Sequence, residues 1–192
     1  GPKEPFFVRT IGTDDLLIKR LMAELYGRGV DPCLGGENRR VVLISEWDSI
    51  YARTFSETLR RALQCSDQGI RVKLQTYSYL RGLDGATLDN LTTQVRRGND
   101  NARGADKAPP VEWPEGRAQS DYVRRLVQEI LKDNDKYPVQ AVGMIGSDVH
   151  DKLVLMQALR EAFPDRMLFT TDMDARLSHP SVTRYTRNVI VA

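Results

Sequence analysis

The stretch VVLISEWDSIYART at residues 41–54 determines the fold class of this chain. It opens with four consecutive apolar residues, Val41 to Ile44, that do not alternate with polar ones. Such a run is typical of a parallel strand that is covered on both faces. A polar turn follows at residues 45–49, and Tyr51 then begins a segment whose apolar residues recur at helical spacing. The stretch therefore predicts a buried strand, a polar turn and a helix.

The same alternation of strands and helices continues along the chain. Apolar runs predict strands, and apolar stripes that follow a capping residue predict helices. The predicted strands are residues 6–9, 41–44, 70–79, 141–145, 167–170 and 189–191, and the predicted helices are residues 14–26, 51–62, 122–131 and 149–163, with a short one from 179–181. The strand at 70–79 alternates apolar and polar residues, which places it near a sheet edge. Together these elements predict an α/β fold of Rossmann-like kind, a mostly parallel sheet with helices on both faces.

The length and composition limit the number of domains and the kinds of partner. We interpret residues 1–192 as a single α/β lobe, because a chain of this length can bury one sizeable core. Residues 81–119 show no sustained apolar period and are rich in glycine, proline and charge, which predicts a long flexible loop. The net charge of +2 arises from interspersed acids and bases, so no nucleic-acid partner is expected. No apolar run approaches the ~20 residues that span a bilayer, so no membrane contact is expected of this segment.

Polar and aromatic residues follow the first strand of the core. In a parallel sheet, ligands bind outside the carboxyl ends of the strands, and Glu46, Trp47 and Asp48 occupy that position. A carboxylate there can pair with a ligand ammonium group, and the rings of Trp47 and Tyr51 can cover it by cation–π contact. The alternative is that Asp48 or Ser49 caps the following helix while Tyr51 packs in the core. Both interpretations stay open for Glu46 and Trp47, whereas capping is favoured for Ser49.

Two later strands end in similar polar turns. Ser147 and Asp148 offer a hydroxyl, a carboxylate and backbone N–H groups at a helix N-terminus, where capping is the favoured interpretation. Thr171 and Asp172 follow a further strand. Because the carboxyl ends of parallel strands meet at one edge of the sheet, we expect these residues to share that edge with Glu46.

Four short signatures, read in order along the chain, carry a resemblance to a known family. They are FVRT at residues 7–10 with the helix start Asp14-Asp15, the strand, acidic turn and tyrosine of residues 41–53, QSDY at residues 119–122, and Thr171-Asp172. Together they resemble the type I periplasmic-binding-protein family, which includes leucine/isoleucine/valine-binding proteins and the ligand domains of natriuretic-peptide and glutamate receptors. Two departures are Ala52, where the family usually has glycine, and the segment 81–118, which is longer than the family's loop.

The resemblance implies one lobe of a two-lobed ligand-binding protein. The chain matches the second lobe only, so it is expected to be a fragment of a larger protein whose partner lobe is missing. The implied function is non-enzymatic binding or sensing of a small molecule, amino-acid-like or cationic, with no catalytic residue, metal or cofactor. The expected ligand-binding residues are Glu46, Trp47, Asp48, Tyr51, Ser147, Asp148, Thr171 and Asp172.

A second interpretation belongs to a different class of protein. Glu46 after an early strand, with Asp172 and Asp174 after a later one, resembles the Toprim arrangement of nucleases and topoisomerases. Those carboxylates hold Mg²⁺ for phosphodiester chemistry. Toprim motifs usually place glycine beside the glutamate, whereas this chain has Trp47. The alternative function is therefore a Mg²⁺-dependent nuclease or phosphotransfer domain, which we rank below the binding interpretation.

Overall fold

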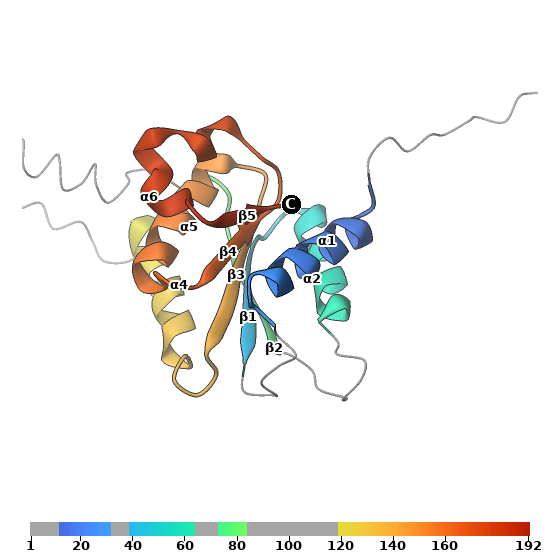
Figure 1. Cartoon of the computed structure of the whole chain (residues 1–192). Coiled ribbons are helices and arrows are strands. Elements are labelled where there is room, and N and C mark those ends of the chain that lie inside the picture. Colours follow the sequence, from blue (N-terminus) through green and yellow to red (C-terminus); the bar gives the residue numbers. More distant parts are fainter. Residues whose placement is uncertain (1–11, 32–38, 64–72, 84–118) are drawn as a thin grey trace, which may run out of the picture.

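The computed structural model describes residues 12–31, 39–63, 73–83 and 119–192 (Figure 1). The predicted strand at residues 6–9, the start of the predicted strand at 70–79 and most of the predicted loop at 81–119 lie outside the described residues. In the described part, a five-stranded sheet lies between two layers of helices.

All five strands of the sheet run parallel, which confirms the predicted fold class. They are β1 (Arg40–Glu46), β2 (Lys73–Tyr79), β3 (Val139–Ile145), β4 (Met167–Thr170) and β5 (Val189–Val191), in the order β2-β1-β3-β4-β5. Every residue of β1 is buried, whereas β2 lies at the edge and is largely exposed or half-buried, as its alternating pattern predicted. In this strand order the direction of winding reverses between β1 and β3, the switch point where doubly wound sheets place their ligands.

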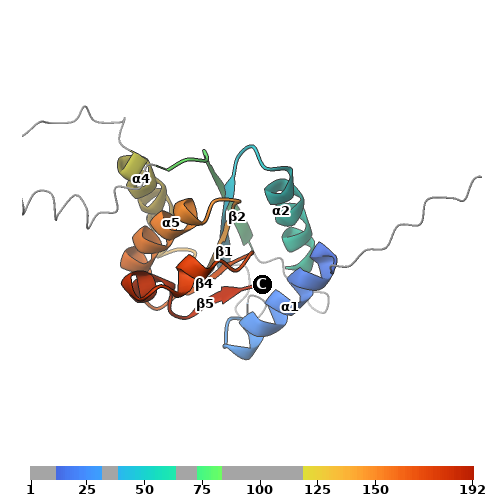
Figure 2. The same cartoon turned by 90° about the horizontal axis from the view of Figure 1, so that it is seen from above.

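Two pairs of helices cover the opposite faces of the sheet (Figures 1 and 2). One face carries α1 (Asp14–Gly27) and α2 (Ile50–Ala62), and the other carries α4 (Gln119–Lys132) and α5 (Val149–Ala162). Neighbouring residues of a strand point to opposite faces. In β1, Val41 and Leu43 therefore pack in the cluster with α1 and α2, whereas Val42 and Ile44 pack in the cluster with α4 and α5. The apolar run lacks alternation because both faces are covered.

Side chains of the preceding turns cap three of these helices. In each case a side-chain oxygen accepts a backbone N–H from two or three residues further on: Thr13 from Leu16 (3.3 Å), Ser49 from Ala52 (3.2 Å) and Asp148 from His150 (2.7 Å). Each such contact satisfies one of the N–H groups that a helix start leaves unpaired. The capping predicted for Ser49 and Asp148 is confirmed.

Short turns lead from β4 to β5. They are η2 (Ala175–Ser178), η3 (Pro180–Val182) and α6 (Thr183–Thr186). As predicted, a short helix starts with Pro180, whose fixed φ suits a first helical position. Tyr185 of α6 packs against the cluster that contains α5. Among the described residues, no helix has the length and apolar character needed to cross a membrane.

The centre of the sheet is closely packed around Gly143 in β3. A Cβ atom at this position would lie 2.3 Å from the ring of Phe169 in β4 and 2.8 Å from the side chain of Leu43 in β1. Both distances are far below van der Waals contact, so the position requires glycine.

A buried arginine lies at the amino end of β1. Arg40 is fully buried, and its guanidinium donates hydrogen bonds to Oε1 of Gln75 and to the carbonyl oxygen of Ile130. These contacts join β1 to β2 and to α4 near the amino ends of the strands. The candidate site described next lies at the opposite, carboxyl ends.

Candidate functional site

The carboxyl ends of β1, β3 and β4 lie at one edge of the sheet. Glu46 is the last residue of β1, Ser147 follows the end of β3, and Thr171 and Asp172 follow the end of β4. Because all strand pairs are parallel, these residues share the same edge, as the sequence predicted.

Glu46 joins the ends of β1 and β3 at the switch point. Its side chain is buried, and Oε2 accepts hydrogen bonds from the backbone N–H of Ser147 at 2.7 Å and from its hydroxyl at 2.9 Å. The guanidinium of Arg81, just after β2, lies 4.0 Å from Oε1. Hydrogen bonds to a charged acceptor are stronger than neutral ones, so this carboxylate stabilises the turn after β3. The ligand role of Glu46 and Ser147 stays a prediction.

The hydroxyl group of Tyr79 lies next to this pair. Tyr79 is 1% exposed, and among the described residues its hydroxyl has no hydrogen-bond partner. A Cβ atom on Gly146 would lie 2.0 Å from the hydroxyl oxygen, so the end of the ring packs directly on the glycine backbone. Burial raises the pKa of Tyr79 well above its usual value, and the charges of Asp151, Glu46 and Asp148 raise it further. The hydroxyl therefore stays protonated.

Trp47 and Asp48 extend from the turn after β1 into solvent. The backbone N–H of Trp47 donates to the carbonyl oxygen of Tyr79 at 2.9 Å, but the residue is 66% exposed. Asp48 is exposed as well. Their ligand role stays a prediction.

Asp151 is a buried acid that the sequence analysis missed. It lies in the first turn of α5, and its two oxygens accept hydrogen bonds from the backbone N–H groups of Gly82 at 3.0 Å and Leu83 at 2.7 Å. It therefore holds the segment that leaves β2. No local signal could reveal this role, because the partners lie far away in the sequence.

Lys152, also missed, contacts the turn after β4. Its ammonium group donates to the carbonyl oxygen of Thr171 at 2.7 Å and lies 3.7 Å from Oδ2 of Asp172. The hydroxyl of Thr171 donates to the same Oδ2 at 3.0 Å. Asp172 has φ of 61°, a left-handed conformation that aspartate tolerates better than most residues. Together these contacts hold the Asp172 carboxylate close to Thr171 and Lys152.

A hollow of about 380 Å³ opens beside this turn, and we call it the Tyr51 hollow. It brings together the start of α1, the first turn of α2 and the turn after β4. The residues that line it are Gly12, Thr13, Asp14, Leu16, Leu17, Arg20, Tyr51 and Asp172. Two predicted site residues, Tyr51 and Asp172, therefore meet in one hollow. The contribution of α1 was missed, because its sequence shows only a cap and an amphipathic stripe.

The Tyr51 side chain is half-buried between these elements. Burial raises the pKa of Tyr51, a hydrogen bond with Thr171 lowers it, and the charges of Asp172 and Asp14 raise it again. The net effect is a raised pKa, so the phenol is neutral at physiological pH. The hollow thus combines a neutral aromatic ring with two carboxylates, those of Asp14 and Asp172.

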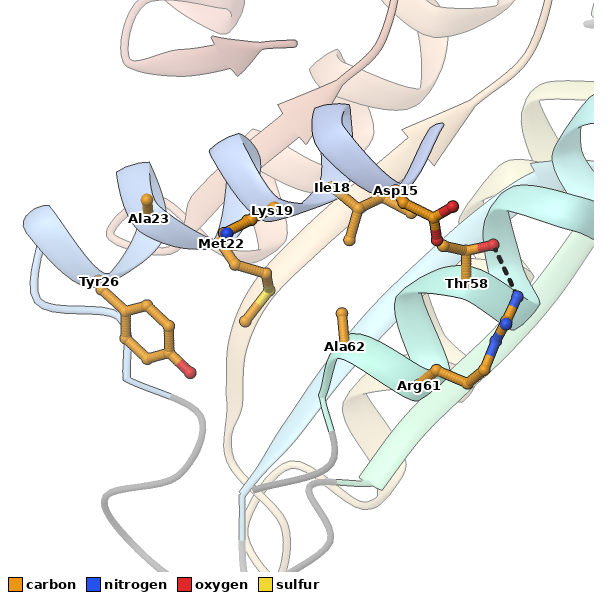
Figure 3. A pocket seen from close by; sticks show the side chains of 9 residues that line it. All are labelled: Asp15, Ile18, Lys19, Met22, Ala23, Tyr26, Thr58, Arg61 and Ala62. Carbon is orange, nitrogen blue, oxygen red and sulfur yellow. Dashed lines mark hydrogen bonds between the residues drawn. The ribbon is translucent and has the colours of Figure 1, made fainter. Parts of the chain in front are cut away.

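A second hollow, of about 440 Å³, lies between α1 and α2 (Figure 3), and we call it the α1–α2 hollow. Its lining is Asp15, Ile18, Lys19, Met22, Ala23, Tyr26, Thr58, Arg61 and Ala62. Arg61 donates to the hydroxyl of Thr58 at 3.3 Å within this lining. No predicted site residue lines it, and its α2 residues come from the end of the helix that is distant from the carboxyl edge. The Tyr51 hollow is therefore the better candidate site.

The structure does not gather the carboxylates of the Toprim interpretation. In the described ranges, no group of three or more His, Cys, Asp or Glu side chains is placed to hold a metal ion. Asp174 pairs with Arg176 instead, at 2.9 Å, and hydrogen bonds from Arg176 lower the pKa of Asp174 to about 2. Glu46 accepts hydrogen bonds from Ser147, and the ammonium group of Lys152 lies 3.7 Å from Asp172.

No family model matches the chain, and no curated protein matches its sequence. The fold itself is a Rossmann-like α/β lobe with an all-parallel sheet. The resemblance to the periplasmic-binding family stays a prediction.

Proposed function

We propose that this lobe binds a small molecule in the Tyr51 hollow and acts as a non-enzymatic sensor or binding module of the type I periplasmic-binding kind. The observation that carries the proposal is that Tyr51 and Asp172, which follow two different strands, line one hollow at the carboxyl edge. In open α/β sheets this edge is where ligands bind.

The lining of the hollow favours a ligand with a cationic group. Asp14 and Asp172 offer carboxylates, and the neutral ring of Tyr51 can cover an ammonium group by cation–π contact. Arg20 can bind the carboxylate of an amino-acid-like ligand, since a guanidinium can donate two parallel hydrogen bonds to one carboxylate. Leu16 and Leu17 provide apolar contact for the rest of the molecule.

Exposed apolar side chains at the same edge support a second lobe that faces it. Trp47, Ile50, Leu80 and Met173 are between 64% and 75% exposed, and they follow β1, β2 and β4. Large apolar side chains that gather on one side of a molecule are typical of an interaction surface. The proposed partner is therefore the missing lobe of the same protein, which would close the other side of the ligand site.

The proposal is tested by calorimetry and thermal unfolding of the purified chain with choline and with each standard amino acid. At a hundredfold excess over Kd, a ligand stabilises the folded state by about 2.7 kcal/mol. This corresponds to a rise in Tm of about 5–10 °C for a domain of this size. We expect such a rise with at least one of these ligands and its loss in Asp172→Asn and in Tyr51→Ala.

Asp165→Asn is the matched control, because Asp165 is an exposed acid that lies outside the hollow and is no predicted site residue. It is expected to bind the ligand as the unsubstituted chain does. The proposal is wrong if no ligand in the set binds, or if Asp172→Asn binds it with unchanged affinity.

No observation favours the nuclease or phosphotransfer alternative. It requires Glu46, Asp172 and Asp174 to hold a metal together, and in the described ranges no group of three such side chains is placed to do so.

A further inference from the structure

Lys152 reaches from helix α5 to the carboxyl end of β4. It belongs to α5, which covers one face of the sheet, yet its ammonium group reaches the turn after β4 that borders the Tyr51 hollow on the opposite face. The side chain is 3% exposed, so the charge lies inside the protein.

The burial of this ammonium group is costly for folding. Its hydrogen bond goes to a neutral carbonyl oxygen, and the nearest carboxylate oxygen, of Asp172, lies 3.7 Å away on a side chain that is 73% exposed. Burial lowers the pKa of Lys152, although the charges of Asp172, Asp174 and Glu46 act in the opposite direction. Buried ionic contacts are often no more stable than apolar residues of similar size. Stability alone therefore does not account for a lysine here.

The contacts of Lys152 determine how Asp172 presents its carboxylate. Oδ2 of Asp172 accepts a hydrogen bond from the hydroxyl of Thr171 and lies near the ammonium group of Lys152. Both groups contact Oδ2, so the printed contacts leave Oδ1 of this hollow-lining residue available to a ligand. The backbone of Asp172 is in the left-handed conformation, and the hydrogen bond from Lys152 to the Thr171 carbonyl holds the residue just before it.

We propose that Lys152 is a positioning residue of the Tyr51 hollow and sets its charge preference. The inference rests on the proposed function. The charged residues that line the hollow are Asp14, Asp172 and Arg20, and the ammonium of Lys152 lies beside Asp172. The charges of Asp174 and Glu46 act on Lys152 as well. The positive charge of Lys152 beside Asp172 repels a second cationic group, so the hollow takes ligands with one cationic group in preference to ligands with two.

The test compares n-butylamine with putrescine, which have the same carbon chain and carry one and two ammonium groups. Binding is measured by calorimetry to the unsubstituted chain, Lys152→Met and Lys152→Arg. We expect the unsubstituted chain and Lys152→Arg to prefer n-butylamine. Loss of one nearby charge in Lys152→Met should strengthen putrescine binding about tenfold relative to n-butylamine. If Lys152→Met does not fold, Lys152→Gln, which is neutral but can still donate to Thr171, should give the same change.

Two outcomes separate this inference from the proposed function. If n-butylamine binds but the preference is the same in all variants, the inference is wrong and the proposed function stands. If neither amine binds, the NMR chemical shifts of Thr171, Asp172 and the Tyr51 ring still test whether Lys152 positions these residues. These signals should move in Lys152→Met and return toward the original values in Lys152→Arg, and signals that stay in place in Lys152→Met would overturn the inference.

Discussion

At the scale of single residues, the buried hydroxyl of Tyr79 is the clearest unsatisfied group near the site. Among the described residues it has no hydrogen-bond partner, and an unpaired buried hydroxyl destabilises the folded state. We therefore expect Tyr79→Phe to raise the free energy of unfolding by about 1 kcal/mol, measured by urea denaturation at neutral pH.

The pH dependence of the free energy of unfolding provides a second measurement for Tyr79→Phe. The pKa of Tyr79 is raised above its usual 10.0 in the folded state, so the unfolded chain releases this proton first as the pH increases. The unsubstituted chain should lose stability relative to Tyr79→Phe as the pH rises through 10 and beyond. A constant difference between the two proteins across this range would contradict the buried placement.

The contact between Glu46 and Ser147 should appear as energetic coupling. Glu46→Ala leaves the N–H of Ser147 without its acceptor, whereas Ser147→Ala removes only the hydroxyl donor. We expect Glu46→Ala to lower the free energy of unfolding by about 1.5–3 kcal/mol and Ser147→Ala by less. A double-mutant cycle measures the coupling energy between the two residues. The control is Asp48→Ala, at an exposed acid near Glu46, which should change the free energy of unfolding by less than about 0.5 kcal/mol. Additive effects of the two substitutions would show that the contact is absent in solution.

Residue roles were predictable from the sequence only where the partner is local. Ser49 and Asp148 accept hydrogen bonds from residues of the next helical turn, so their capping role is visible in the sequence. Glu46 meets a residue 101 positions away, and Lys152 one 19 positions away. Such pairs arise from the arrangement of the strands, and no short pattern records them.

At the scale of secondary structure elements, β3 depends on Gly143. Gly143→Ala places a methyl group 2.3 Å from the ring of Phe169. The ring of Phe169 or the neighbouring strands must therefore move apart to make room for it. We expect a loss of about 1–3 kcal/mol in the free energy of unfolding or failure to fold, measured by urea denaturation. Gly27→Ala is the control, because a Cβ atom there meets nothing within 4 Å at the end of α1. A Gly143→Ala protein as stable as the control would show that β3 and β4 are packed differently.

The helices and strands themselves were largely predictable from the sequence. Which of them lie side by side was not. The unbroken apolar run of β1 and the partial alternation of β2 correctly distinguished a central strand from an edge strand. The sequence gives no sign that β1 pairs with β3, because pairing depends on the helices between the strands. For the same reason, the position of α1 beside Tyr51 could not be foreseen.

At the scale of the whole molecule, Mg²⁺ distinguishes the two classes of function. Within the part of the chain that the structure describes, Glu46, Asp172 and Asp174 belong to no group of acids placed to hold a metal ion. We expect millimolar Mg²⁺ to leave the Tm nearly unchanged. A clear rise in Tm that is lost in Asp172→Asn, together with cleavage of a nucleic acid, would support the nuclease interpretation instead.

The Tyr51 hollow joins parts of the chain that are far apart in sequence. Asp14 begins α1, before the first described strand, whereas Asp172 follows β4. A ligand that contacts both would act as a reversible cross-link across most of the chain. Such a link opposes the local detachment of α1, since opening would require loss of the ligand. Bound ligand should therefore slow the amide hydrogen exchange of α1 more than that of α4, which has no contact with the hollow, and equal slowing of both helices would speak against a site at this position.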